Sequence, residues 1–126
     1  MRLGRGSIVL VDLDPGAGHE QSGVRPCIVV SDPAAIVDQR YPLVCVVPVT
    51  GTPGQGLLYP PLEPGNSGLT KKSYALTDHL RSLDKRRIRR VFGGISPEEM
   101  AAVDEGITLF LGLGIGGDGI DPLPLQ

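Results

Sequence analysis

The 126-residue sequence contains no tryptophan and has only two phenylalanines, three tyrosines, two histidines and two cysteines. So few aromatic rings exclude the large stacking platform on which many proteins bind single-stranded nucleic acids. No apolar run approaches the roughly 20 residues of a membrane-spanning helix. The amino terminus also lacks the apolar segment of a signal peptide. We therefore expect a cytoplasmic chain that makes no contact with a membrane.

Metal-ligating side chains are equally sparse. No carboxylates or histidines are grouped at metal-ligand spacing, so we expect no metal and no cofactor, and a two-metal nuclease is disfavoured. Cys27 and Cys45 each lie within an apolar, β-branched stretch. That setting predicts two buried, reduced thiols.

Glycine and proline are abundant, with 18 and 12 residues, and 40% of the chain is hydrophobic. This composition predicts one domain of short strands separated by many turns. Apolar and alternating segments indicate strands at residues 7–12, 26–31, 43–49, 57–59, 73–77 and 90–95. The 43–49 segment is nearly all apolar and should be buried on both faces. Residues 82–88 are expected to form a short helical turn.

One helix has clear signals at both ends. Ser96 is the expected N-cap, with proline next and Glu99 completing a capping box, and Gly112 and Gly114 end the helix. Its expected apolar face consists of Met100, Val103, Ile107, Phe110 and Leu111. The fold class is thus mainly β (α+β), a small β-barrel or strongly curved sheet closed by a C-terminal helix. Residues 1–113 form the single domain, and the Gly/Pro-rich acidic tail 114–126 is expected to be disordered.

Charge is distributed unevenly along the chain. Residues 71–90 carry eight basic and two acidic side chains, a net charge of +6, whereas residues 91–126 carry −6 and residues 1–70 carry −2. A single basic block in a chain of net charge −2 suits a local contact with a polyanion. A solvated charged turn is the alternative.

A polar loop at residues 18–26 separates two strongly apolar runs, 8–11 and 27–30. Loops carried on a rigid β scaffold often hold binding and catalytic groups. Arg25 precedes a proline, which favours an extended backbone, and its guanidinium matches a phosphate bidentately. The alternative role of Arg25 is an ion pair at the barrel rim with Asp12, Asp14 or Glu20.

Three motifs together are specific: Arg5-Gly6-x-x-x-x-Val11-Asp12-Leu13-Asp14-Pro15, Gly23-x-Arg25-Pro26 and Val47-Pro48-Val49-Thr50. With them the chain resembles the MazF/PemK/Kid family of toxin endoribonucleases from Arg5 to about Leu113. The resemblance implies an SH3-like barrel of the plasmid-maintenance-toxin type. It also implies a compact homodimer whose RNA groove crosses the dimer interface.

The resemblance assigns catalysis to Arg25 and Thr50, which would stabilise the scissile phosphate. Without a metal, the nucleophile would be the 2′-hydroxyl of the RNA itself. The products would be a 2′,3′-cyclic phosphate and a 5′-hydroxyl, and DNA would be inert. Possible acid/base or positioning roles fall to Glu20, His19 and Asp78, the last matching the base of the Kid branch. The expected RNA-binding residues are Gln21, Ser22, His79, Arg81, Lys85 and Arg86.

The chain departs from the family at two positions. His79 stands where most members have glutamine, which puts base recognition in question. Leu76 stands where Kid has an arginine two residues before the aspartate, so no mechanism that needs that arginine carries over.

As a member of this family, the chain would be the toxin of a type II toxin–antitoxin pair that cleaves mRNA and arrests growth. Its partner would be a short antitoxin with an acidic, disordered tail, and the complex would bind DNA. Two alternatives remain. One is a gyrase-poisoning toxin of the CcdB type, whose key contacts would lie on the C-terminal helix. The other is a degenerate member that binds RNA or antitoxin without cleaving.

Overall fold

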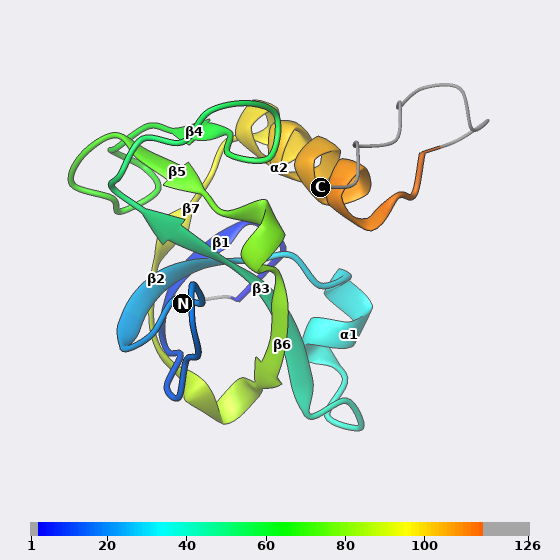
Figure 1. Cartoon of the computed structure of the whole chain (residues 1–126). Helices are drawn as coiled ribbons and strands as arrows, with labels where there is room; N and C mark the ends of the chain where they lie inside the picture. The colour runs from blue at the N-terminus through cyan, green and yellow to red at the C-terminus, as the bar shows by residue number, and fades with distance from the viewer. Residues whose placement is uncertain (1–2, 115–126) are drawn as a thin grey trace.

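The computed structural model describes residues 3–114, which form a curled antiparallel sheet with a helix across it (Figure 1). The elements in chain order are β1 (Ser7–Asp12), β2 (Val24–Val29), α1 (Pro33–Val37), β3 (Leu43–Thr50), β4 (Pro61–Leu62), β5 (Ser73–Ala75), the 3₁₀ turn η1 (Thr77–His79), β6 (Arg81–Asp84), the 3₁₀ turn η2 (Lys85–Arg87), β7 (Ile88–Gly94) and α2 (Pro97–Leu111). The strand order is β4-β5-β3-β2-β1-β7, and β6 also pairs with β3. The expected barrel with a C-terminal helix is confirmed as a half-barrel.

Alternation along the central strands separates two hydrophobic cores. Val9, Val11, Cys27, Val29 and their neighbours on β3 fill the inside of the curl. The residues that alternate with them form the second core, which packs against α2. Because successive side chains of a strand point to opposite faces, every core strand is buried on both sides. This explains why β2 and β3 are almost continuously apolar, as expected for residues 43–49.

Helix α2 begins as its sequence predicts. The Ser96 hydroxyl accepts a hydrogen bond from the Glu99 backbone, the Glu99 carboxylate accepts one from the Ser96 backbone, and Gly112 ends the helix in the left-handed conformation. Val103 is fully buried, but Phe110 and Leu111 are about half exposed. The expected apolar face was wrong at these two positions, because the last turn of α2 extends beyond the sheet (Figure 1).

Several strand predictions need correction. The sheet has seven strands rather than five or six. Residues 57–59 form a turn, and the fourth strand begins only at Pro61. The fifth strand ends at Ala75, because Thr77 starts η1. Residues 82–88 are not one helical turn but the end of β6, η2 and the first residue of β7.

Helix α1 was missed, although its local signal is ordinary. The Asp32 carboxylate caps it by accepting a hydrogen bond from the Ala34 backbone at 2.8 Å, and Pro33 occupies the first turn. Such Asp-Pro starts are typical of helices. At five residues this helix is too short to give a detectable apolar period.

The two cysteines are both free, Cys27 fully buried and Cys45 partly exposed, so burial was predicted correctly only for Cys27. Among residues 3–114 no helix is long and apolar enough to cross a membrane. The expected disorder of the tail concerns residues that, from 115 onward, lie outside the described part of the chain.

Candidate active site

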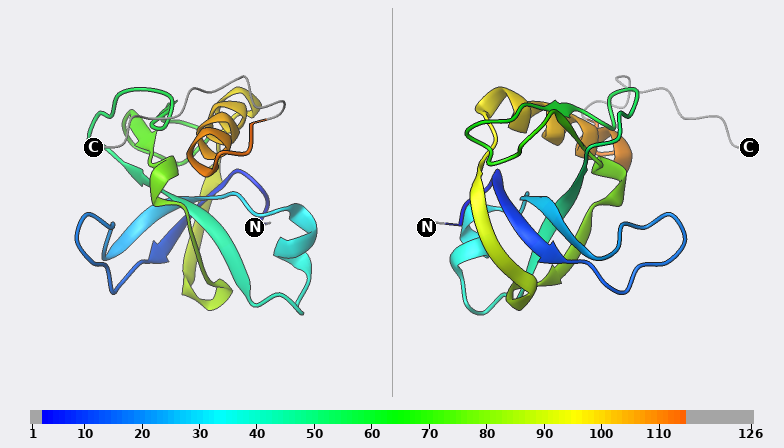
Figure 2. Two further views of the ribbon diagram at one scale, coloured as in Figure 1. Left: turned by 45° about the vertical axis from the view of Figure 1, so that its right-hand side comes forward. Right: turned by 90° about the vertical axis from the view of Figure 1, so that its left-hand side faces the viewer.

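A pocket with a volume of about 550 Å³ opens between the β1–β2 loop and η1. The loop projects from the half-barrel, as the right-hand view of Figure 2 shows. The lining residues are Leu13, Pro15, His19, Glu20, Gln21, Pro48, Asp78, His79, Leu80 and Arg81. Leu13, a core residue, follows β1, and Pro48 lies within β3, so the pocket continues the interior of the curl to the surface.

Hydrogen bonds across its base close the β1–β2 loop. The Asp14 carboxylate accepts from the Gly23 backbone at 2.8 Å, and the Leu13 backbone donates to the Gly23 carbonyl at 2.9 Å. Farther out, the Glu20 carboxylate accepts from the Ala17 backbone at 2.9 Å. These bonds give a long polar loop a defined shape, which a binding wall requires.

Two arginines from the basic block anchor the same loop to the sheet. Arg81 donates to the Leu13 carbonyl at 3.1 Å, and Arg87 donates to the Asp14 carbonyl at 2.9 Å and the Asp12 carbonyl at 3.3 Å. Part of the positive charge of residues 71–90 thus serves to position the pocket wall.

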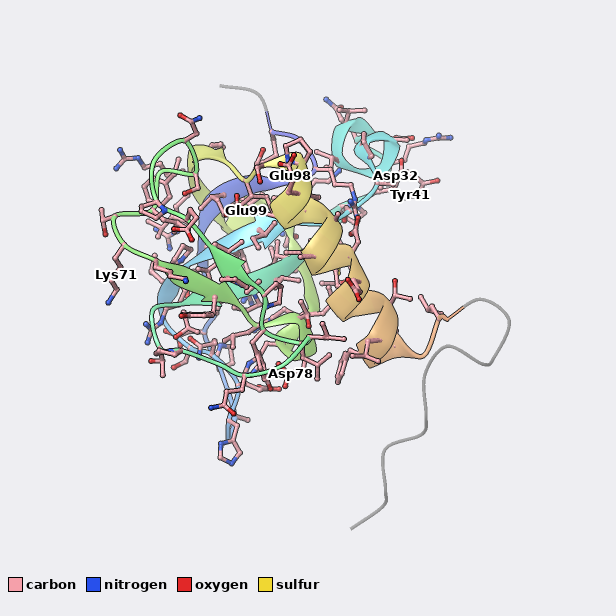
Figure 3. All side chains as sticks on the ribbon, turned by 90° about the horizontal axis from the view of Figure 1, so that it is seen from above. Asp32, Tyr41, Lys71, Asp78, Glu98 and Glu99 are labelled. Carbon is pink, nitrogen blue, oxygen red and sulfur yellow. The ribbon has the colours of Figure 1, made fainter. Side chains whose placement is uncertain are left out.

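On the opposite wall, η1 presents Asp78 and His79 (Figure 3 labels Asp78). The turn is fixed to β3, because the Leu76 backbone donates to the Pro48 carbonyl at 2.9 Å. Asp78 Oδ2 accepts from the Tyr59 hydroxyl at 2.7 Å. Asp78 Oδ1 is buried without a hydrogen-bond partner, 3.7 Å from His79 Nε2. The hydrogen bond to Asp78 raises the pKa of Tyr59.

Arg25 and Thr50 lie beside this pocket without lining it. In the antiparallel pairing of β2 with β3, Cys27 opposite Pro48 is the last pair at this end. Arg25 lies two residues before Cys27, and Thr50 lies two residues after Pro48, so both residues follow the same end of the pairing. Strand alternation then directs both side chains to the face of Cys27 and Pro48, the face on which the pocket opens.

The functional atoms of this pair are available. Arg25 is exposed and donates from Nε to the Ser22 carbonyl at 3.0 Å. Within residues 3–114 it forms no ion pair with Asp12, Asp14 or Glu20. The Thr50 hydroxyl oxygen accepts from the Thr52 backbone at 3.2 Å, which leaves its proton free to be donated.

The structure therefore brings together most of the residues predicted for the site. His19, Glu20, Gln21, Asp78, His79 and Arg81 line one pocket. Ser22 belongs to the same loop and holds Arg25 through its carbonyl.

Lys85 and Arg86 lie elsewhere, at the opposite end of β3 from Thr50. Lys85 donates through Nζ to the carbonyls of Ala35 and Asp38, at 2.8 and 3.1 Å. Arg86 pairs with Asp84 and lowers the pKa of that carboxyl to about 2. Their expected contact with RNA stays a prediction.

Two residues near the site were missed. Tyr59 follows a glycine-rich turn and carries no motif, so its bond to Asp78 has no sequence signal. For Lys71 the sequence predicts nothing beyond membership of the basic block, residues 71–90. A Cβ added to Gly51 would lie 2.8 Å from Lys71 Nζ, so the ammonium rests against the residue that follows Thr50.

Cys27 is unsuited to nucleophilic chemistry. Burial raises the pKa of its thiol to about 12, with a smaller opposing effect from nearby Arg81, and the thiolate is the reactive form. In the described part of the chain, no three His, Cys, Asp or Glu side chains converge as a metal site would require.

Comparison with known families gives one match over nearly all of the described chain. The model of the family described as PemK-like, MazF-like toxin of type II toxin–antitoxin system matches residues 4–111.

Solved structures agree with this match. The chain is similar to MazF from Deinococcus radiodurans, with 32% identity, 87% of this chain and 96% of that chain covered, and a TM-score of 0.74. A MazE–MazF structure from the same organism matches with 30% identity, coverage of 89% and 97%, and a TM-score of 0.69. An endoribonuclease in complex with its cognate antitoxin, from a mycobacterial species, shares the fold at 23% identity, coverage of 90% and 98%, and a TM-score of 0.73.

Proposed function

The chain belongs to the PemK-like, MazF-like family of toxins of type II toxin–antitoxin systems, and from that premise we propose that it is a metal-independent, sequence-specific endoribonuclease acting on single-stranded RNA. The observation that supports the proposal is the pairing of β2 with β3, which ends at Cys27 and Pro48, so that Arg25 and Thr50 each lie two residues beyond the same end, and Pro48 lines the pocket. Proteins similar in structure to this chain include an endoribonuclease from a mycobacterial species.

The reaction we propose needs two donors at one phosphate. The 2′-hydroxyl of the nucleotide 5′ to the scissile bond attacks the phosphorus, and negative charge grows on the non-bridging oxygens. The Arg25 guanidinium and the Thr50 hydroxyl stabilise that charge. The bond to the 5′ oxygen breaks, leaving a 2′,3′-cyclic phosphate and a 5′-hydroxyl. Because DNA lacks the nucleophile, it is not cleaved.

The pocket beside Arg25 and Thr50 is the proposed base-reading site. Glu20, Gln21, His79 and Arg81 supply both donors and acceptors to an unstacked base, which is the usual means of reading single-stranded RNA. Ser22 contributes from the same loop. His19 and Asp78 are candidates for proton transfer or positioning. Lys85 and Arg86 would contact RNA only if the strand extends along β3 to its far end.

The proposed biological setting is the cytoplasm, where the protein, as a homodimer, inhibits translation and growth by cleaving mRNA. An antitoxin protein would block the RNA site, and the resulting complex would bind DNA. The solved MazE–MazF structures similar to this chain support the antitoxin as partner. An acidic segment of that antitoxin would compete with RNA for Arg25 and Lys71.

The test compares wild type, Arg25→Ala and Arg40→Ala on mixed-sequence single-stranded RNA. Arg40 is a matched control, because its side chain is exposed, pairs with Asp38 at the end of α1 and lies over the Tyr41 ring. We expect wild type and Arg40→Ala to give the same discrete fragments. Arg25→Ala should cleave at least about 100-fold more slowly with an unchanged melting temperature, because the loss removes charge stabilisation at an exposed position.

Normal cleavage by Arg25→Ala would contradict the proposal. A folded wild type that binds RNA or an antitoxin without cleaving would indicate the degenerate reading. Inhibition of DNA gyrase without RNA cleavage would indicate the CcdB-like one.

A further inference from the structure

Asp78 is oriented more firmly than a solvated carboxylate. Its Oδ2 atom is held by the Tyr59 hydroxyl at 2.7 Å. Its Oδ1 atom is buried and has no hydrogen-bond partner. An unsatisfied buried acceptor costs about 1–3 kcal/mol, so Oδ1 needs a donor that the free protein does not fully supply.

His79 Nε2 lies 3.7 Å from Asp78 Oδ1 and is the group placed to become its donor. A hydrogen bond between these atoms requires an approach of about 1 Å, since N–H···O distances centre near 2.9 Å. Hydrogen bonds between catalytic groups are often long in free enzymes and shorten with substrate bound. The imidazole and the carboxylate are both about one-quarter exposed, and both line the pocket.

Tyr59, Asp78 and His79 therefore form a chain in which each group can orient the next. This is the arrangement of a base oriented by a carboxylate, which recurs on unrelated folds and is recognised by geometry. Bonded through Nε2–H to Asp78, the imidazole keeps Nδ1 as its acceptor. The backbone bond from Leu76 to the Pro48 carbonyl sets η1 two residues along β3 from Thr50.

We propose that His79 is the general base of the cleavage reaction, with Asp78 and Tyr59 as its positioning residues. The inference rests on the proposed function and assigns its proton transfer.

Nδ1 of neutral His79 takes the proton of the 2′-hydroxyl while the O2′–P bond forms and the P–O5′ bond breaks. The departing 5′ oxygen takes a proton from water. The hydroxide so formed is neutralised by the proton that His79 then releases to solvent. No net proton is consumed, and Arg25 and Thr50 stabilise the phosphorane throughout.

The charged neighbours of His79 come from every side of the pocket. Asp78 precedes it, Arg81 follows on β6, and His19 and Glu20 face it from the β1–β2 loop. Helix α2 also packs on η1, but its Asp104 is paired with Arg5 and its Glu105 is exposed. The phenol of Tyr59 completes the set.

The test uses His79→Gln, which installs a side chain of similar size that cannot accept the proton. We expect the single-turnover cleavage rate at pH 7.5 to fall about 100-fold, the usual contribution of a general base. Because glutamine also offers a donor and an acceptor to a base, binding of a non-cleavable 2′-deoxy RNA should change less than about threefold. The dependence of the wild-type rate on pH should be lost in the variant. Imidazole added to His79→Ala should restore part of the rate.

A second measurement does not depend on cleavage. Nitrogen NMR of the two histidines, assigned with His79→Gln, should report the Nε2–H tautomer for His79 in wild type. That preference should be lost in Asp78→Asn and weakened in Tyr59→Phe. An Nδ1–H tautomer in wild type would overturn the orientation argument.

The outcomes separate the two proposals. A wild type that cleaves RNA while His79→Gln keeps its rate and pH profile overturns only the role of His79. A folded wild type that cleaves no RNA overturns the proposed function, and the catalytic role of His79 with it.

Discussion

At the scale of single residues, the oxygens of Asp78 and Thr50 decide what the site can do. Thr50 ends β3, and its hydroxyl oxygen is already engaged by the Thr52 backbone. The hydroxyl can still donate its proton, and a phosphate oxygen is an acceptor for such a hydrogen bond. In the proposed reaction, Thr50 therefore acts as a hydrogen-bond donor rather than as a nucleophile.

Thr50→Val tests that role, because valine keeps the shape and removes the hydroxyl. We expect cleavage to fall by about 10²–10³-fold, the range found when one such donor is lost. Thr50→Ser should retain most of the rate. Equal rates for valine and threonine at this position would remove Thr50 from the reaction. Melting temperatures of both variants serve as the folding control.

The bond from Tyr59 to Asp78 makes a prediction at alkaline pH. The carboxylate disfavours a phenolate beside it, so the pKa of Tyr59 is raised in the folded state. The stability from this bond is present below the unfolded value of about 10 and is lost as pH rises through the higher folded value. In an ultraviolet titration of the folded protein, one tyrosine should ionise above pH 10. Asp78→Asn should abolish this late step, and its persistence there would show another cause.

At the scale of elements, α2 positions η1 through a close approach. A Cβ on Gly106 would lie 2.9 Å from the Leu57 carbonyl oxygen and 2.9 Å from the Thr77 side chain. Backbone cannot move away as cheaply as a flexible side chain. The glycine thus lets the helix lie directly on the turn that carries Asp78 and His79.

Gly106→Ala should therefore destabilise the protein, although alanine is the better helix former. Overpacking costs about 1–3 kcal/mol, against a helix-propensity gain of about 1 kcal/mol. We expect a melting temperature lower by several degrees and a reduced cleavage rate, since η1 would shift. Ala101→Ser, on the exposed face, should leave both unchanged. A more stable Gly106→Ala variant would contradict the close approach.

The buried middle and the exposed last turn of α2 provide a matched pair of variants. Val103 is fully buried and Phe110 is 47% exposed. An unpaired charge at the first position costs several kcal/mol, a large part of the 5–15 kcal/mol that stabilises a typical domain. Val103→Asp should unfold the protein, whereas Phe110→Asp should keep its fold, both judged by circular dichroism. The reverse order would show that the last turn of the helix, and not its middle, packs against the core.

At the scale of the whole molecule, the features that could be predicted from the sequence are those that depend on a short local pattern of residues. The apolar runs of β1, β2 and β3 and the capping box at Ser96 follow from short stretches of sequence. The loop residues His19 and Glu20 meet Asp78 and His79 only because the sheet curls. The family resemblance predicted these residues from their motifs. The distances between them depend on the fold and could not be predicted from the sequence.

The basic block illustrates what sequence could not predict. Its charges are contiguous in the chain but separated in space, because η2 and the turn before β5 lie at opposite ends of β3. Arg81, Lys85 and Arg87 donate to backbone carbonyls, and such bonds depend on which loops the sheet brings near. Only part of the +6 charge is thus available to a polyanion near Thr50.

The most direct measurement of the central claim is the chemistry of the RNA ends. Purified protein is incubated with single-stranded RNA in excess EDTA, and a second substrate carries one 2′-deoxy nucleotide 5′ to the mapped cleavage site. We predict discrete fragments with 2′,3′-cyclic phosphate and 5′-hydroxyl ends from the first substrate, and none at that site from the second. Cleavage of the deoxy substrate, 5′-phosphate products, or a reaction that stops in EDTA would contradict the account.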